Sequence, residues 1–530
     1  MSRYAALIIA ALISVGGAVF WKTGPAAQST AILAALVTLL GLYDLVQKRH
    51  SLWRNYPLLS RVRWLAEELR PFFRSYIVES ETEGRPFNHE DRAMIYRRAK
   101  DVTSVEPFGS HLDIDRPPYE WLAHSMAAVH ADDSDPRVMV GAPGTAQPYS
   151  ASVFNISAMS FGSLGAHAIE ALSAGAKKGG FYHDTGEGGV SRYHRKGGAD
   201  LVWEIGSGYF GCRAKDGGFD PERFRDVAAD PQVKMIEIKL SQGAKPGHGG
   251  VLPGAKVTHE IAEARGIEVG QTCVSPPAHS AFSSPVEMME FAAKLRELSG
   301  GKPVGAKFAV GNRWEVLALC KAMLETGIRL DFMVVDGGEG GTGAAPAEFL
   351  DHVGAPLRQG LVLTRNALVG TGLKDEVRLA CSGKQISAFA IASSMALGAD
   401  WVNTARGFMF ALGCIQSLNC HNNHCPTGIA TSDKSRQHGL DVSDKTLRVA
   451  NFHRNTVKAL TEVVGAAGCR HPSELTPRHI MHRVTEDIVR PADESYDLLQ
   501  RGQLLHDADA THLAKEWNLA QAGSFRPAGL

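Results

Sequence analysis

The sequence predicts an α/β fold, a (β/α)8 barrel of the TIM type, preceded by an N-terminal transmembrane helical hairpin. Three observations support this prediction. From residue 151 onward, short apolar runs alternate with longer helical patterns, glycine-rich loops follow most of the runs, and two uncharged apolar stretches lie near the start. Strand–loop–helix alternation over about 250 residues indicates parallel strands with crossover helices, and this length suits a closed barrel. An open, doubly wound sheet is the alternative.

Residues 1–48 are predicted to form the hairpin. Residues 4–21 and 23–43 carry no charge apart from the intervening Lys22, and the turn signal Gly24-Pro25 lies at the junction. Each stretch approaches the length of a membrane span. Basic residues follow the second stretch, so the positive-inside rule predicts a two-helix inner-membrane protein with a cytoplasmic catalytic domain. A buried soluble hairpin is the alternative, and a secretory signal peptide explains only the first stretch.

Residues 49–150 are predicted to be a linker or arm packed on the barrel. Aromatic residues stand among arginines in residues 52–69, which fits either an amphipathic helix at the membrane interface or a helix packed on the next domain. Residues 89–100 are predicted to form a further helix.

Residues 151–435 are predicted to form the barrel, and residues 436–530 a C-terminal helical tail. The apolar runs that predict strands are residues 153–159, 235–240, 304–310, 332–335, 377–381 and 401–404. Helical patterns occupy residues 285–298, 313–325 and 387–397 between them, and residues 449–465 after them.

The composition narrows the class of protein. The chain has 530 residues, 44% of them hydrophobic, which indicates a folded protein with more than one structural unit. Lysine plus arginine and aspartate plus glutamate number 56 each, so no basic excess points to nucleic acid. Eight cysteines do not make a disulfide framework in a chain of this length, and they favour a reducing compartment.

Three cysteines lie close together in the segment from Gly413 to Gly428: Cys414, Cys420 and Cys425. Thiolates gathered in one loop can hold an iron–sulfur centre, and a proline directly after the last cysteine also occurs in ferredoxins. Zinc is the alternative on spacing alone, because His421 or His424 can supply a fourth ligand.

Glycine-rich loops follow several predicted strands, at residues 185–189, 242–250, 336–343 and 382–384. Glycine lets backbone N–H groups approach an anion, so these loops predict a phosphate-bearing cofactor. In barrels of this type the phosphate often lies at the last two strands, here at Ser382-Gly383 and Arg406-Gly407. The lone GxGxxG match within residues 338–343 has no acidic partner about 20 positions on, so we reject a Rossmann site there.

Charged and amide side chains also gather at the predicted barrel mouth. Four of them suit the binding of substrate carboxylates: Lys239, Gln242, Lys245 and Arg265. Lys307, at the end of an apolar strand, can stabilise the negative charge of a reduced flavin. Glu187 and Glu339 are candidate acid/base or ammonia-binding groups.

Taken together, these loops resemble the FMN-binding synthase domain of glutamate synthase. The matching stretches are residues 157–163, 185–189, 239–247, 340–343 and 413–431, in the order of that family. The resemblance implies a (β/α)8 barrel, FMN and a [3Fe–4S] cluster held by the three cysteines, which excludes zinc. It also implies reductive amination of 2-oxoglutarate to L-glutamate.

The resemblance also implies roles for individual residues. Positions that match the family's FMN site, with further residues of the same loops, give the expected cofactor-binding set: Met159, Ser160, Gln242, Lys307, Gly341, Thr342, Gly343, Ser382, Gly383, Arg406 and Gly407. The expected substrate-binding residues are Lys239, Gln242, Lys245 and Arg265. The expected catalytic residues are Glu187, Lys307 and Glu339.

Three departures from the family affect the prediction. The chain shows neither the N-terminal glutaminase with its cysteine nor the long C-terminal β-helix, so ammonia is expected from elsewhere. His248 stands where many members have glutamate, and Glu339 where many have aspartate. We expect ferredoxin or an NAD(P)H-oxidising subunit as electron donor. The alternatives are an N-methylglutamate synthase type that accepts methylamine, another FMN-dependent 2-oxo acid/amine oxidoreductase, and a membrane-tethered electron-transfer flavoprotein without amination activity.

Overall fold

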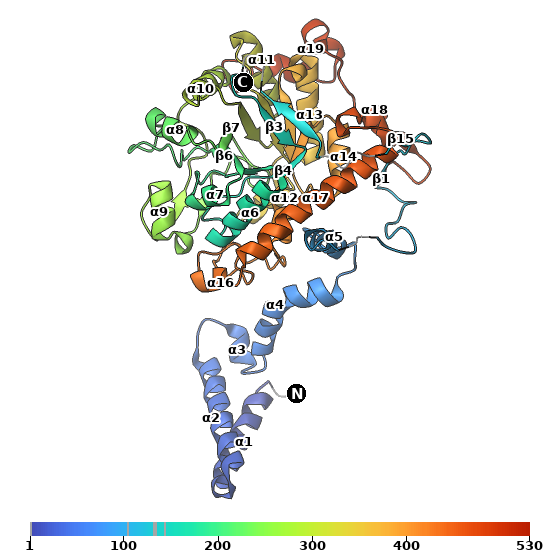
Figure 1. The fold of residues 1–530 in the computed structure, drawn as a ribbon. Helices are drawn as coiled ribbons and strands as arrows, with labels where there is room; N and C mark the ends of the chain where they lie inside the picture. The colour runs from blue at the N-terminus through green and yellow to red at the C-terminus, as the bar shows by residue number, and fades with distance from the viewer. Residues whose placement is uncertain (1–2, 103–104, 131–134, 142–144, 530) are drawn as a thin grey trace. The chain divides into compact units, whose positions relative to one another are not determined.

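The computed structural model describes residues 3–102, 105–130, 135–141 and 145–529. The chain divides into two compact units, Met1–His89 and Glu90–Leu530, which are described separately (Figure 1). The boundaries predicted after residues 48, 150 and 435 stay predictions.

The first unit begins with two apolar helices, α1 (Ala5–Val19) and α2 (Pro25–Val46), connected by a short 3-10 turn at Trp21–Thr23. The helices pack side by side as the predicted hairpin, and Gly17 lies against Ala31 with no space for a Cβ atom (Figure 1). Most of their large apolar side chains are exposed. Of the described helices, α2 alone is long and apolar enough to cross a membrane, while α1 is apolar but shorter.

The remainder of this unit corrects the prediction of one helix over residues 52–69. Two helices, α3 (Ser51–Asn55) and α4 (Arg61–Phe73), are separated by a turn that contains Pro57, and a π-helical turn (Arg74–Val78) follows α4. Proline constrains the residue before it away from helical geometry. The turn is tied to α2 because the buried Asp44 accepts hydrogen bonds from the Leu58 N–H at 3.0 Å and from Arg61 Nη2 at 2.6 Å.

The second unit contains a closed barrel of eight parallel strands, which confirms the predicted fold; the open sheet is wrong. In chain order the strands are β4 (Phe154–Ile156), β5 (Tyr182–Asp184), β6 (Asp200–Ile205), β7 (Val233–Lys239), β10 (Val304–Phe308), β11 (Phe332–Asp336), β12 (Arg378–Ser382) and β13 (Trp401–Thr404). The ring closes where β13 pairs with β4. Apolar runs predicted all of these strands except β5 and β6, which carry charged side chains towards the barrel interior.

Helices cover the outside of the strands (Figure 1). They are α6 (Ala166–Gly179), α7 (Arg192–Gly197), α8 (Pro221–Ala228), α10 (Pro285–Leu298), α11 (Arg313–Thr326), α13 (Leu357–Gly370), α14 (Ala388–Ala396) and α15 (Arg406–Ala411). The short helix α12 (Ala347–His352) has no buried residue, and its Phe349 contacts His248 in the segment after β7. Local sequence explains the start of α10, where Pro285 occupies the first turn and Ser284 Oγ accepts the Glu287 N–H.

A long insertion separates β7 from α10. It contains β8 (Val251–Leu252), a 3-10 turn (Gly254–Lys256), α9 (His259–Arg265) and β9 (Cys273–Val274), with β8 and β9 paired antiparallel. Because it follows a barrel strand, the insertion places its side chains at the carboxyl end of the barrel, where Lys245 and Arg265 are needed.

The ends of this unit pack on the barrel. β1 (Tyr119–Leu122) pairs with β14 (Ile480–Arg483), which pairs with β15 (Val489–Pro491), while β2 (Arg137–Val140) pairs with β3 (Tyr149–Ser152). The long helix α17 (Val442–Ala466) lies against α6 and α14. The remaining helices are α5 (His89–Ala99), α16 (Lys434–His438), α18 (Ala492–Ser495), α19 (Gln503–His506) and α20 (Ala514–Leu519). The segment after residue 435 therefore contains strands as well as the expected helices.

Candidate functional site

A cleft opens at the carboxyl ends of the strands, the end at which barrels of this type carry their active sites. It brings together many of the predicted residues: Met159, Ser160, Glu187, Lys239, Gln242, Lys245, Arg265, Gly341, Thr342, Gly343, Arg406 and Cys420. Its cavity volume is about 120 Å³. This is below the roughly 300 Å³ of the smallest usual ligand pockets, so a flavin-sized ligand would extend into the open mouth between the glycine-rich loops.

Lys239, at the end of β7, connects the cleft with the barrel interior. Its Nζ donates to Gln242 Oε1 at 2.6 Å and lies 3.2 Å from Glu187 Oε2 and 3.7 Å from Glu204 Oε1. Burial opposes the charged form of the lysine, but the two carboxylates outweigh burial and raise its pKa. Lys239 is therefore an ammonium ion that orients Gln242 and Glu187 at the cleft floor.

Lys307, on β10, lies deeper in the barrel and does not line the cleft. Its Nζ donates to Glu204 Oε2 at 2.8 Å and lies 4.0 Å from Glu237 Oε1. Burial disfavours its charge, yet the surrounding carboxylates, Glu204 first among them, raise its pKa well above the ordinary value. Glu204 was not predicted as a site residue, because no apolar run marked β6; its signal in the sequence is an isolated acid in an apolar stretch.

Two buried cations face the cleft without an acidic partner. Lys245 and Arg265 are only 4% and 6% exposed, and among the described carboxylates none lies within 4.0 Å of either. Arg265 Nη2 reaches only Ser160 Oγ at 3.5 Å and the Phe161 carbonyl at 3.4 Å, and its Nε donates to no described residue. Burial lowers the pKa of Lys245 in spite of the Glu187 charge. Buried charges are normally paired, so this pair fits an anionic ligand.

The glycine-rich loops form another wall of the cleft. Gly341 approaches Arg406 so closely that a Cβ atom would lie 2.7 Å from Nε, and Arg406 Nη2 donates to the Thr342 carbonyl. Ser382, Gly383 and Gly407 do not line the cleft: Ser382 Oγ donates to Asp336 Oδ1 at 2.7 Å, and Gly383 has a φ of 135° that favours glycine.

The structure does not bring Glu339 into the cleft lining. Its Oε2 accepts the Leu357 N–H at 2.8 Å, at the first residue of α13. Exposed N–H groups at a helix start attract carboxylates, so this contact gives Glu339 a helix-capping environment.

The cysteine loop lies beside the cleft and is held in a constrained conformation. Gln416, Leu418 and Asn423 all have positive φ angles, which are uncommon for residues other than glycine. Asn423 Oδ1 fixes the loop by accepting the Ser432 N–H at 2.7 Å. Arg406 Nη1 lies 3.9 Å from Cys420 Sγ, so one arginine contacts both this loop and the Gly341–Gly343 wall.

The sulfur atoms of this loop are too far apart for one zinc ion. Zinc binds thiolates at about 2.3 Å, so the sulfurs on one ion lie within about 4.6 Å of one another. Within the described part of the chain, no group of three ligand atoms within 4.8 Å includes Cys414, Cys420 or Cys425. A centre with several metal ions is wider. Burial raises the pKa of Cys414 to about 11, whereas hydrogen bonds, that of Thr427 foremost, outweigh burial and lower the pKa of Cys425.

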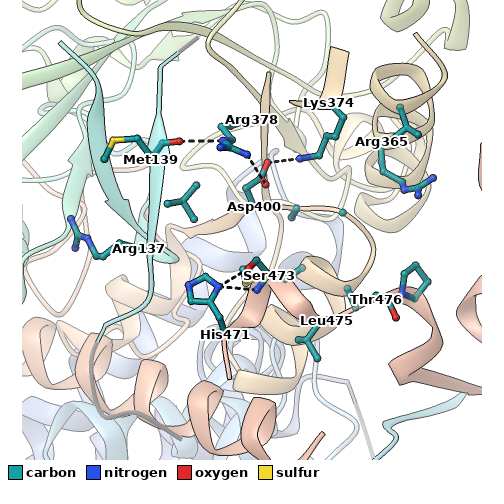
Figure 2. A pocket seen from close by; sticks show the side chains of 17 residues that line it. Arg137, Met139, Arg365, Lys374, Arg378, Asp400, His471, Ser473, Leu475 and Thr476 are labelled. Carbon is teal, nitrogen blue, oxygen red and sulfur yellow. Dashed lines mark hydrogen bonds and ion pairs between the residues drawn. The ribbon is translucent and has the colours of Figure 1, made fainter. Parts of the chain in front are cut away.

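A larger cavity, about 470 Å³, lies at the amino ends of the strands, where Arg378 begins β12 and Asp400 precedes β13 (Figure 2). Its charged groups are used within the protein: Lys374 Nζ donates to Asp400 Oδ2 at 2.7 Å, and Arg378 Nε donates to the Met139 carbonyl at 3.1 Å. This end of a barrel usually serves stability. We therefore place the functional site in the smaller cleft, in spite of its smaller volume.

Comparison with known proteins identifies the family of the chain. Residues 131–470 match the conserved region in glutamate synthase. The chain is 36% identical over 496 residues to the glutamate synthase large subunit-like protein YerD of Bacillus subtilis, covering 86% of this chain and 94% of that protein. It is 33% identical over 314 residues to the archaeal-type glutamate synthase [NADPH] of Thermotoga neapolitana, covering 59% of this chain and 58% of that protein.

A solved structure of a flavocytochrome b2 variant with sulfite bound aligns over 83% of this chain and 89% of that chain, with 13% identity and a TM-score of 0.42, too low to add to the argument. The two sequence relationships and the family match suffice. The chain belongs to the glutamate synthase family, whose members are oxidoreductases that act on CH–NH2 donors.

Proposed function

We propose that the protein catalyses FMN- and [3Fe–4S]-dependent reductive amination of 2-oxoglutarate to L-glutamate, with ammonia supplied from elsewhere. The observation that carries this proposal is the pair of buried cations, Lys245 and Arg265, that face the cleft without an acidic partner. A dicarboxylate supplies two negative charges, one for each cation. Arginine can hold one carboxylate with two parallel hydrogen bonds, and lysine can hold the other as a point charge.

The residues around the cleft fit a flavin phosphate and ring. Gly341, Thr342, Gly343 and Arg406 suit the phosphate, because glycine exposes backbone N–H groups and arginine supplies a fixed cation. Lys307 supplies a positive charge beneath the cleft for the ring. When bound, FMN supplies the hydride for the reduction.

Glu187 is the proposed acid/base group of the reaction. Its carboxylate lines the cleft and lies 3.2 Å from Lys239 Nζ, which keeps it oriented. In this position it can bind the incoming ammonia and move a proton to or from the reacting nitrogen. Glu339 is not assigned this role, because its carboxylate contacts the start of α13.

Cys414, Cys420 and Cys425 are the residues that would hold the [3Fe–4S] cluster, which would supply a place for electrons from ferredoxin or an NAD(P)H-oxidising subunit to enter. Support comes from their common loop, from sulfurs that do not all lie within 4.8 Å of one another and from the position of Cys420 in the cleft wall. Arg406 lies between this loop and the proposed phosphate loop.

The α1–α2 hairpin is the proposed inner-membrane anchor, with the barrel in the cytoplasm. Its large apolar side chains are exposed, including Leu12, Leu36 and Leu39. On α4, Val62, Leu65, Leu69 and Phe72 form an exposed apolar stripe at helical spacing, as in helices that lie at a membrane interface.

The half-reaction tests the proposed function directly. We expect anaerobically photoreduced protein to be reoxidised by 2-oxoglutarate and ammonium together, with glutamate formed, and by neither compound alone. Reoxidation with methylamine in place of ammonium would identify an N-methylglutamate synthase type. If every 2-oxo acid and amine leaves the flavin reduced while both cofactors are intact, an electron-transfer protein without amination activity is correct instead.

Lys245→Ala should weaken 2-oxoglutarate binding. Loss of one partner of a buried charge pair costs about 2 kcal/mol or more, which corresponds to a roughly 30-fold higher dissociation constant. Flavin perturbation during titration with 2-oxoglutarate measures this constant. Lys178→Ala, which removes an exposed lysine on α6, is the control and should leave it unchanged. Equal affinity of the Lys245 variant and the unmodified protein would refute the assignment.

Cys420→Ala should abolish the iron–sulfur signal in electron paramagnetic resonance while FMN remains bound, since the phosphate loop lies on a different segment. Cys469→Ala, at a cysteine outside this loop, should retain both cofactors. Retention of the iron by the Cys420 variant would remove this residue from the ligand set, and loss of both cofactors would show that the two sites are not separable.

Membrane anchoring predicts that the full chain resists extraction from membranes by alkaline carbonate. Leu33→Arg together with Leu36→Arg, both at exposed positions of α2, should release it, because each arginine costs roughly 3 kcal/mol near the centre of a span. Leu505→Arg, at an exposed position of α19, is the matched control. Complete extraction of the unmodified chain would exclude the anchor.

A further inference from the structure

Four neighbouring strands each direct one charged side chain into the barrel interior below the cleft. They are Asp184 on β5, Glu204 on β6, Glu237 on β7 and Lys307 on β10, and their exposed fractions are only 1–3%. One oxygen from each of the three acids lies within 4.8 Å of the others. Three carboxyl groups therefore share one dry site.

Positive charge in this site is insufficient for three ionised acids. Lys307 lies closest to Glu204, at 2.8 Å, and farther from Glu237, at 4.0 Å. The second ammonium, Lys239, lies 3.7 Å from Glu204 but 3.2 Å from Glu187 in the cleft. Both lysines thus lie nearer to Glu204 than to Glu237, and the Oε1 atoms of both acids accept no hydrogen bond from any described residue.

The position of each acid decides which of them is neutral. Closely spaced buried carboxylates cannot all ionise, and the proton goes to those farthest from positive charge. Burial alone would raise the pKa of Glu204, but the positive charges of Lys307 and Lys239 outweigh burial and lower it. At Asp184 and Glu237 burial and the other acids raise the pKa. Two further groups lie around this site. Asp336 on β11 adds negative charge near Lys307. The Tyr182 phenol on β5 donates a hydrogen bond to Asn403 at 2.6 Å.

We propose that Asp184 and Glu237 share one proton in the barrel interior, and that Glu204, the two lysines and Glu187 form the route by which this proton reaches the cleft. The inference rests on the proposed function for its use. Conversion of 2-oxoglutarate and ammonium into glutamate and water takes up two electrons and two protons. Hydride carries both electrons and one proton, so a second proton must reach the substrate site. The carboxyl pair is its store.

The route consists of alternating acids and cations. From the pair it passes Lys307, Glu204 and Lys239, and it ends at Glu187 in the cleft wall, with the contacts between these side chains at 2.8–4.0 Å. A proton that leaves Glu187 for the substrate is replaced along this series, and the pair regains its proton from solvent after product release. No oxidant or reductant beyond those of the proposed reaction is needed.

Infrared spectroscopy of the full chain with bound flavin tests the shared proton without any substrate. We expect a protonated-carboxyl C=O band at neutral pH that shifts in D2O and disappears in Glu237→Gln and in Asp184→Asn. Glu260→Gln, at an acid on α9 paired with Arg192, is the control and should leave the band unchanged. The same spectrum in unmodified protein and both variants would overturn the proposal. If the glutamine variant does not fold, Glu237→Asp takes its place in the comparison. This variant retains a carboxyl group and should show the band.

A kinetic measurement then tests the route. Glu237→Gln should slow reoxidation by 2-oxoglutarate and ammonium about 100-fold, the usual scale of acid/base assistance, while the dissociation constant for 2-oxoglutarate stays unchanged. An unchanged rate, with the infrared band lost, would overturn the route. The infrared result does not depend on amination: a carboxyl band without glutamate formation refutes the proposed function alone, and glutamate formation without the band refutes this inference alone.

Discussion

Lys307 and Glu204 lie 2.8 Å apart inside the barrel, and each stabilises the charged form of the other. Burial away from water disfavours the charged form of a lysine or a carboxyl group unless an opposite charge lies nearby. With the pair in place, a positive charge lies below the cleft. The other acids nearby are stabilised only by the part of this charge that Glu204 does not neutralise. Lys239 continues this series of charges towards the cleft, where its ammonium group contacts Gln242 and Glu187. The electrostatics of the whole cleft floor therefore follow from this one contact.

The fold makes this arrangement possible in two ways. The closed ring of parallel strands brings β5, β6, β7 and β10 side by side, so four residues far apart in the chain direct their charges to one point. The insertion between β7 and α10 then adds what the strands cannot supply, because it carries Lys245 and Arg265 over the carboxyl end of the barrel. The cleft therefore has a floor in which acids and lysines contact one another, and a wall in which Lys245 and Arg265 have no acidic partner.

Much of this could be predicted from the sequence, and the misses have physical reasons. Apolar runs identified six of the eight barrel strands because those strands are buried on both faces. β5 has only three residues, two of them polar or charged, and β6 has an acid at its first and fifth positions, so neither gave an apolar run and Glu204 was missed. The glycine-rich loops and the cysteine spacing located the cleft and its wall. The contact of Glu339 with α13 depends on where another helix begins, which is not encoded locally. The break between α3 and α4 did have a local signal, Pro57, and Asp44 then holds the turn through the Leu58 N–H.

The pairing of β13 with β4 has a consequence for how the protein is made. β4 is the first barrel strand to leave the ribosome, yet its partner on one side is the last. Until β13 is synthesised, the growing sheet has two open edges and an incomplete interior that contains charged groups. Unpaired edges invite association with other chains. Even then α17, which covers α6 and α14, is still missing. Synthesis of this protein thus includes a long interval in which shielding by chaperones matters most.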